Sequence, residues 1–182
     1  MLEGQFIGVQ EPKSVFTLKK RFTVLKSGRI LLHATALGLY FAEVNGERVG
    51  DAYIAPGWTS YKKMLQVQEY DVTDLLREGE NEIVFTVSEG WYCGPLTWEH
   101  KRNVFGAQTA ICADIIADGK TVLSTDENWT ARESHIRESG IYNGETVDYT
   151  AECKPLTPVV VSFDKNVLVP QISEPVRNTE RI

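Results

Sequence analysis

Three polar segments of the sequence contain the residue types that bind sugars: residues 45–61, 89–98 and 140–148. A sugar site combines an aromatic ring, which stacks on the C–H face of a pyranose, with planar polar groups that hydrogen-bond its hydroxyls. We therefore treat these segments as a candidate carbohydrate-binding site. Its predicted members are Trp91 or Tyr92 for stacking, Trp58 as an apolar cover, and Asp51, Asn143 and Glu145 for the hydroxyls.

The same segments also have a purely structural interpretation. Trp58, Tyr61 and Trp91 could fill the open ends of a folded core, as large aromatic side chains commonly do. Asn and Asp side chains often hydrogen-bond their own backbone and thereby fix turns. The sequence leaves both interpretations open, because it does not show whether the three segments meet in an open groove.

No motif in the sequence predicts catalysis. It has no Gly-x-Ser-x-Gly elbow, phosphate-binding loop, dinucleotide fingerprint or His-Glu-x-x-His zinc helix. His33, His100 and His135 are scattered, and the 25 acidic residues do not by their number single out an acid/base pair. We therefore expect no enzyme activity in this chain itself.

Composition excludes several classes of partner. The formal net charge is −6, so the phosphate backbone of a nucleic acid would be repelled. No apolar run reaches the roughly 18 residues that a membrane-spanning segment needs. Neither nucleic acid nor a membrane is expected as a partner.

The cysteines and the N-terminus bear on the cellular compartment. Cys93, Cys112 and Cys153 are odd in number and lack zinc-ligand spacing, which predicts free thiols in a reducing compartment. The first residues have neither a basic stretch nor an apolar one, so no signal peptide is visible. We expect a cytoplasmic location.

Alternation of apolar and polar residues predicts half-buried β-strands along most of the chain. Phe16, Leu18 and Phe22, for example, would share one face of a strand, opposite Lys19 and Arg21. Predicted strands cover residues 16–24, 29–37, 40–44, 82–88 and 109–116, with shorter ones at 67–72, 121–124, 129–132 and 159–163.

Turn signals between these strands favour an antiparallel arrangement. Asn45-Gly46 and Asp118-Gly119 are two-residue hairpin signals. Residues 109–116 are apolar on both faces, as in a central strand, and residues 71–76 are predicted as one short helical turn. The fold class expected is all-β, an antiparallel β-sandwich of the jelly-roll, galactose-binding-like kind.

The chain is expected to contain one domain. Residues 14–153 would form the sandwich, after a leading segment at 1–13. Residues 154–182 hold four of the seven prolines. They are predicted as a last strand and a Pro-rich linker to a downstream domain.

Five blocks in order resemble the N-terminal sandwich domain of bacterial α-L-rhamnosidases. NGxxVG turns occur in other sandwiches, so the specificity comes from the order and spacing of all five blocks. The similarity runs from about Phe16 to Val169, nearly the whole chain. The blocks are YFAEVNGERVGD at 40–51, APGWTSY at 55–61, YDVTDLL at 70–76, EGWY at 89–92 and IYNGETVD at 141–148.

The resemblance implies an accessory role in a glycoside hydrolase. In this family a separate (α/α)₆ barrel supplies the carboxylate acid and base for hydrolysis with inversion, which requires two carboxyls far enough apart to admit a water. This chain would be a non-catalytic module that assists recognition of rhamnose-containing carbohydrate. Its other partners would be domains of the same polypeptide.

Some relatives bind rhamnose with the help of calcium, so the resemblance also implies a metal site. Calcium takes six to eight oxygen ligands. Val147, Cys93 and Pro95 depart from the usual family pattern and put a working sugar pocket in question. The predicted calcium ligands are Asp51, Asn143, Glu145 and Asp148, with backbone carbonyls.

Two further functional interpretations remain open. The module could brace the catalytic barrel without binding sugar, or it could be a free-standing adhesion or receptor-like domain. The Pro-rich C-terminal stretch argues against the latter. The first alternative differs from sugar binding only in whether the three segments form an open groove.

Overall fold

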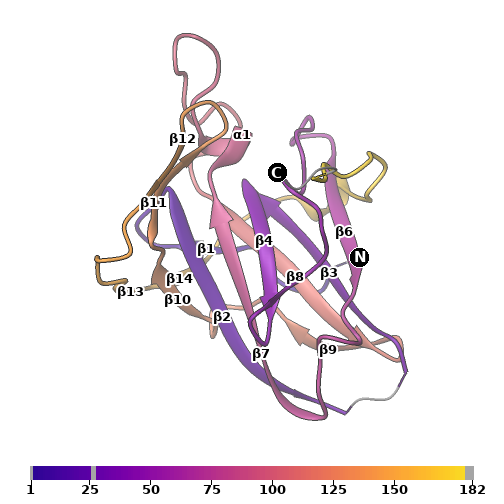
Figure 1. Cartoon of the computed structure of the whole chain (residues 1–182). Helices are drawn as coiled ribbons and strands as arrows, with labels where there is room; N and C mark the ends of the chain where they lie inside the picture. Colours follow the sequence, from indigo (N-terminus) through magenta and orange to yellow (C-terminus); the bar gives the residue numbers. More distant parts are fainter. Residues whose placement is uncertain (1, 26–27, 179–182) are drawn as a thin grey trace.

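Two β-sheets packed face to face make up the molecule (Figure 1). A computed structural model describes residues 2–25 and 28–178. In its seven-stranded sheet the order is β14 (Pro158–Val160), β1 (Ile7–Val9), β8 (Ala110–Ala117), β3 (Ile30–Leu37), β6 (Leu65–Asp71) and β15 (Leu168–Pro170), with β9 (Lys120–Ser124) also paired to β8.

The second sheet has six strands and carries the candidate site. Their order is β13 (Pro155–Leu156), β10 (Thr130–Glu133), β2 (Val15–Val24), β7 (Gly79–Ser88), β4 (Leu39–Val44) and β5 (Glu47–Arg48). A separate hairpin joins β11 (Ile136–Gly140) to β12 (Gly144–Val147). All pairings in the two sheets are antiparallel except β6 with β15, and the predicted all-β sandwich is confirmed.

The core lies between the two sheets and follows the predicted period of two. In β2, Phe16 and Leu18 are fully buried whereas Thr17 and Lys19 are partly exposed. The ring of Phe85 on β7 packs against Trp129 with centroids 5.7 Å apart. All but one of the residues of β8 are buried, as expected for a central strand that is covered on both faces.

Both predicted two-residue hairpins form. Asn45 and Gly46 have φ of 52° and 82° and connect β4 to β5. Asp118 and Gly119 have φ of 50° and 74° and connect β8 to β9. Positive φ at both central positions is what a type I′ turn requires, so the local signal was sufficient here.

The short helical turn predicted at residues 71–76 is wrong. Residues 73–75 form an isolated hydrogen-bonded turn, in which Leu75 N donates to Val72 O at 3.1 Å. Asn81 Oδ1 accepts from Arg77 N at 3.0 Å and so directs the chain into β7 instead of continuing a helix.

Helical structure is short wherever the structure describes the chain. The helix α1 (Gly90–Cys93) lies in a segment that the sequence predicted as a loop. A single 3₁₀ turn, η1, covers Lys165–Val167. No helix in the described ranges has the length and apolar character needed to cross a membrane.

The chain after Lys154 forms short strands along the edges of both sheets. Val161 N donates to Phe6 O at 2.8 Å, and the Phe163 ring packs edge-on against Phe6 at 5.1 Å. Prolines are tolerated here because an edge strand has backbone positions that need no N–H donor. Residues up to 170 are thus more ordered than the predicted linker; where a downstream domain would begin stays a prediction, and residues 179–182 lie outside the described part.

Candidate functional site

A groove of about 380 Å³ lies on the outer face of the six-stranded sheet. Its floor comes from side chains of β4 and β7 that alternate away from the core, including Phe41, Thr86 and Ser88. One wall belongs to segment 45–61 and the other to the β11–β12 hairpin of segment 140–148. Two of the three sugar-type segments therefore border one open groove.

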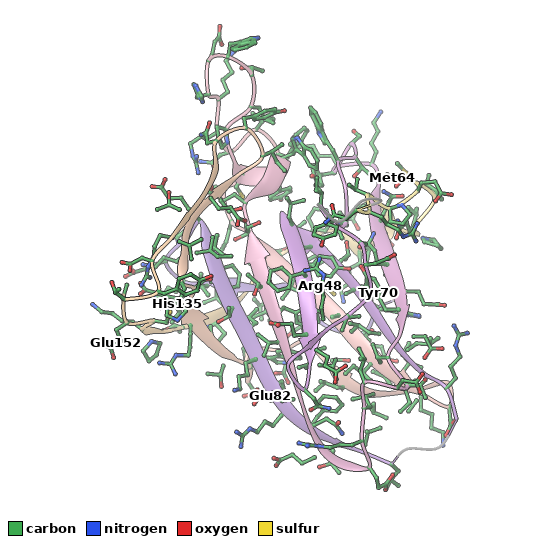
Figure 2. All side chains as sticks on the ribbon, in the orientation of Figure 1. Arg48, Met64, Tyr70, Glu82, His135 and Glu152 are labelled. Atoms are coloured by element: carbon green, nitrogen blue, oxygen red, sulfur yellow. The ribbon has the colours of Figure 1, made fainter. Side chains whose placement is uncertain are left out.

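Arg48 organises the first wall. Its guanidinium carbon lies 5.0 Å from the Phe41 ring centroid and 4.8 Å from that of Tyr53, so the cation is held between two rings. Its Nη2 also donates to Ala52 O at 2.9 Å. Figure 2 shows Arg48 beside β4 in the middle of the molecule. The wall thus combines two rings with a fixed positive charge.

Glu145 and Ser139 form the polar part of the second wall. Ser139 Oγ donates to Glu145 Oε1 at 3.1 Å across the hairpin. Ile136 from the same hairpin and Ile54 from the opposite wall add apolar surface to the groove. The groove therefore offers a carboxylate, a hydroxyl and a guanidinium between apolar and aromatic surfaces.

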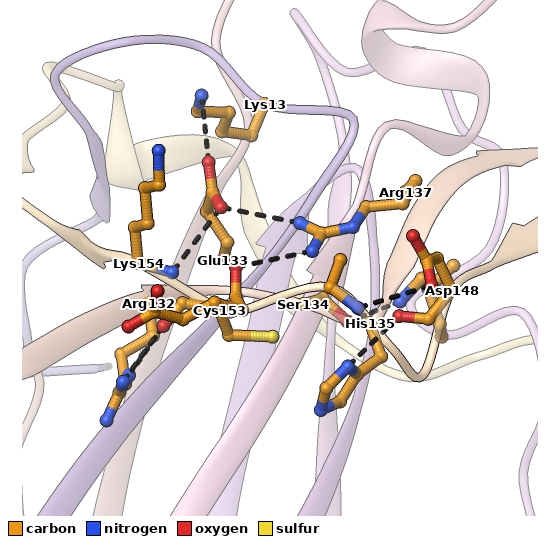
Figure 3. A network of polar contacts seen from close by, with 12 residues as sticks. Lys13, Arg132, Glu133, Ser134, His135, Arg137, Asp148, Cys153 and Lys154 are labelled. Atoms are coloured by element: carbon orange, nitrogen blue, oxygen red, sulfur yellow. Dashed lines mark hydrogen bonds and ion pairs between the residues drawn. The ribbon is translucent and has the colours of Figure 1, made fainter.

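A polar network holds the base of this hairpin (Figure 3). Glu133 at the end of β10 pairs with Lys13 and with Arg137, each at 3.3 Å, and accepts from Lys154 N at 3.4 Å. The Lys154 backbone N–H, followed by Lys13 and Arg137, lowers the pKa of Glu133. The network anchors β11 to β10 and to the chain that follows the hairpin.

Segments 45–61 and 89–98 meet through two stacked tryptophans. The rings of Trp58 and Trp91 are nearly parallel, with an interplanar angle of 14° and centroids 5.6 Å apart. Trp58 is 54% exposed. The structure thus brings these two predicted residues together, with one face of each ring already covered by the other.

Tyr92 is a correction to the predicted site. It is only 7% exposed, and its ring packs edge-on against the buried Tyr61 at 5.1 Å. In α1, Tyr92 points into a second apolar cluster at this end of the sandwich. It cannot offer a stacking face to a sugar, and for Tyr61 and Tyr92 the structural interpretation holds.

The remaining predicted residues are spread out. Asp51 pairs with Arg177 at 2.9 Å, and Asn143 is exposed in the turn between β11 and β12. Asp148 Oδ1 accepts from Thr150 Oγ1 at 2.6 Å and from the N–H of Thr150 at 2.9 Å. These two bonds, the hydroxyl first, lower the pKa of Asp148, which fixes a turn.

The predicted calcium cluster is not assembled by these side chains. Asp51, Glu145 and Asp148 were its acidic members. Within residues 2–25 and 28–178, no group of three or more His, Cys, Asp and Glu side chains is placed to hold a metal ion. Asp51 and Asp148 are instead engaged with Arg177 and Thr150 respectively.

Comparison with known proteins identifies the family. The sequence model of the α-L-rhamnosidase N-terminal domain matches residues 26–180. The chain belongs to this family. An α-L-rhamnosidase of Streptomyces avermitilis is 39% identical over 131 residues, which cover 70% of this chain and 13% of that enzyme.

Solved rhamnosidase structures share the fold of this rhamnosidase N-terminal domain. An α-L-rhamnosidase from Aspergillus terreus superposes with a TM-score of 0.87 at 32% identity, covering 98% of this chain and 23% of that one. The S. avermitilis enzyme complexed with L-rhamnose gives a TM-score of 0.81 at 31% identity, covering 93% and 18%. This chain therefore spans less than a quarter of these relatives.

Sequence reasoning missed several residues that form the groove of this rhamnosidase N-terminal domain. Phe41 carried a usable signal, because it is an aromatic residue on the polar side of an alternating strand. Arg48 and Tyr53 carried none, since their approach to Phe41 depends on how residues 49–57 fold back over the sheet. Ser139 was hidden in a hairpin with no core-facing pattern.

Proposed function

We propose that this rhamnosidase N-terminal domain is a non-catalytic module of a longer α-L-rhamnosidase and that its groove recognises a terminal L-rhamnose. The observation that carries the proposal is the groove of about 380 Å³ between two of the sugar-type segments. Small-ligand sites typically have volumes of about 300–1,000 Å³. The choice of sugar is supported by the S. avermitilis relative, which was crystallised with L-rhamnose.

The groove has the chemistry that a deoxy-sugar requires. Arg48 donates hydrogen bonds and Glu145 accepts them, which suits the adjacent hydroxyls of a pyranose. Tyr53 supplies a ring, and Ile54 and Ile136 supply apolar surface for the C6 methyl. Burial of that methyl is worth about 0.8 kcal/mol. The sugar would lie across β4 with its methyl toward an isoleucine.

Titration of the 182-residue chain with L-rhamnose, followed by NMR, tests sugar recognition. We expect saturable shifts at millimolar sugar, and at least about a tenfold loss of affinity in Tyr53→Ala and in Glu145→Ala, equivalent to about 1.4 kcal/mol each. Tyr149→Ala is the matched control, because Tyr149 is 81% exposed and does not line the groove. No shifts in the wild type, or equal affinity in all variants, would refute the groove as the site.

The non-catalytic part of the proposal is supported by the carboxyl groups. A general acid for glycoside hydrolysis needs a raised pKa. In the described residues, the carboxyl groups with a resolved shift are Asp71, Glu82, Glu133 and Asp148, and the pKa of each is lowered. We propose that inverting hydrolysis takes place in another domain of the longer enzyme.

An assay with an aryl α-L-rhamnoside tests this part. We expect no turnover by the purified chain above the buffer rate. Turnover that disappears in Glu145→Gln, the variant of the groove carboxylate, would contradict the non-catalytic role. Turnover that persists in Glu145→Gln would point to a contaminating enzyme, which repurification of both samples would remove.

A second candidate function is interdomain bracing, and one residue favours it. Trp98 is 100% exposed at the tip of a loop that projects beyond α1 (Figure 1). Leu96 and Lys101 exchange backbone hydrogen bonds of 2.7 and 2.9 Å, so the projecting loop is an ordered hairpin. A fully exposed indole on an ordered loop is typical of a contact surface. Its partner would be another domain of the same polypeptide.

Acrylamide quenching of tryptophan fluorescence separates the two functions. Comparison of the wild type with Trp98→Ala isolates the Trp98 emission in this chain and in a longer rhamnosidase that contains it. Under bracing, Trp98 is quenched in the short chain and protected in the long one. Equal quenching in both would exclude Trp98 as an interdomain contact and leave sugar binding unaffected.

A further inference from the structure

A small cavity of about 40 Å³ lies beneath the C-terminal strap, which we define as residues 171–176. The strap crosses the loop of residues 52–57, and both line the cavity. Gln68 of β6 also lines it and is only 2% exposed. The Nε2 atom of Gln68 is buried and has no hydrogen-bond partner. Buried amide groups are almost always paired, so this atom requires an explanation.

The other end of the Gln68 amide is engaged. Tyr40 Oη lies 2.9 Å from Gln68 Oε1 and 3.2 Å from the carbonyl oxygen of Ala34. If the hydroxyl donates to Gln68, the amide nitrogen faces the cavity. If the hydroxyl donates to Ala34, it can accept from the Gln68 nitrogen, and the amide oxygen then faces the cavity. In both arrangements one polar amide atom points into the cavity, so its ligand must be able to accept or donate.

We infer that this cavity is a binding site for one ordered water molecule, which hydrogen-bonds the Gln68 amide beneath the strap. A water needs about 10–15 Å³ of such volume and occupies roughly 30 Å³ in the liquid. The cavity of about 40 Å³ therefore holds one water and excludes larger ligands. Water also satisfies either orientation of the amide, which a metal ion or an anion cannot do.

The neighbouring glutamine shows why the position matters. Gln66 lies two residues before Gln68, on the same face of β6. Its Oε1 accepts from the N–H groups of Ile172 and Ser173 at 2.9 and 3.0 Å, and its Nε2 donates to Pro56 O at 3.3 Å. Gln66 thus links the strap directly to the 52–57 loop, and the water beside Gln68 extends this link.

The link reaches the groove. Tyr53 N donates to Val176 O at 2.8 Å, and Tyr53 and Ile54 form part of the groove wall. The strap and its water therefore support the wall from behind. This holds whether or not the groove binds rhamnose, so the inference does not depend on the proposed function.

NMR detects the water directly in the 182-residue chain. We expect a cross-peak between water and the side-chain NH₂ of Gln68, with the sign of a long-lived bound water. The NH₂ of Gln66 is the internal control and should show none, because it bonds to Pro56 and Ser173. An assigned Gln68 NH₂ without a water cross-peak would overturn the inference.

Variants test the support of the strap. Gln68→Met removes the water's partner, so we expect the unfolding midpoint to fall by about 2–4 °C and the Ile172 and Ser173 amides to exchange about tenfold faster. Tyr40→Phe is the matched control: it removes the Tyr40 contact, and the water cross-peak and strap exchange should persist.

A dry cavity gives the opposite result. Replacing an unpaired buried amide with an apolar side chain of similar size is neutral or stabilising. An unchanged or raised midpoint in Gln68→Met would therefore overturn the water site. Faster strap exchange in Tyr40→Phe as well would show that Tyr40, not the water, supports the strap.

Discussion

Single charged residues set how the domain responds to acid, and Asp71 is the clearest case. It accepts from Thr73 Oγ1 at 2.6 Å and pairs with Arg29 at 2.8 Å. The Thr73 hydroxyl, followed by Arg29, lowers the pKa of Asp71 from 3.8 to about 2. A pKa lowered by folding gives stability that is present above the unfolded pKa and is lost as the pH falls through the folded pKa. We predict that Asp71→Asn loses less thermal stability than the wild type between pH 3.8 and about 2.

Thermal unfolding by circular dichroism from neutral pH to about pH 2 measures this difference. Asp74→Asn is the matched control, because Asp74 is an exposed carboxylate in the same turn. It should reproduce the acid limb of the wild type. Parallel curves for wild type and Asp71→Asn would show that the contacts of Asp71 contribute nothing to acid stability.

The thiols give a second prediction at this scale. All three cysteines are free, as the sequence predicted. Burial raises the pKa of Cys93 and of Cys112 to about 12, whereas Cys153 is partly exposed. Thiolate is the reactive form, so Ellman's reagent at about pH 8 should modify one thiol per native chain. The Cys153→Ser variant should show none, and denaturant should reveal all; rapid reaction of two native thiols would contradict this burial.

At the scale of elements, the sequence predicted what local chemistry decides. Asn45-Gly46 and Asp118-Gly119 require positive φ and formed the expected hairpins. The β11–β12 hairpin was not predicted, because β12 is exposed throughout and shows no core-facing alternation. The groove was half predicted: Glu145 belongs to it, whereas Arg48 owes its position to ring contacts that no local pattern encodes.

Two glycines separate backbone conformation from close packing within these elements. Gly46 has φ of 82°, and an added Cβ would meet nothing within 4 Å. Gly38 has φ of 128°, and an added Cβ would lie 2.2 Å from Ser88 O. We predict that Gly46→Ala lowers the free energy of unfolding by about 1 kcal/mol and Gly38→Ala by about 3 kcal/mol or more.

Urea unfolding of both variants gives the two free energies. Gly119→Ala is a useful control, because its φ of 74° and its open surroundings match those of Gly46. Its loss should equal that of Gly46→Ala within error. Equal losses at Gly38 and Gly46 would mean that the chain at Gly38 can shift away from Ser88.

At the scale of the whole molecule, the two ends of the chain complete the sandwich. Strand β1 lies between β14 and β8, so the N-terminal segment joins a late strand to the central one. Phe6 and Phe163 pack together at 5.1 Å. Neither end of the chain stands apart from the sheets, so the predicted division at residues 14 and 153 would cut through paired strands.

This arrangement predicts that a fragment of residues 14–153 does not fold stably. It would lack Phe6, Ile7 and Val9, which are 2%, 0% and 1% exposed. Burying each contributes about 1.5–3 kcal/mol, so their loss approaches the whole stability of a typical domain, about 5–15 kcal/mol. We expect poor NMR amide dispersion and no cooperative melt for the fragment, whereas residues 1–178 should melt like the full chain. A cooperative melt of 14–153 near the midpoint of the full chain would show instead that the terminal strands are an addition to a self-sufficient sandwich.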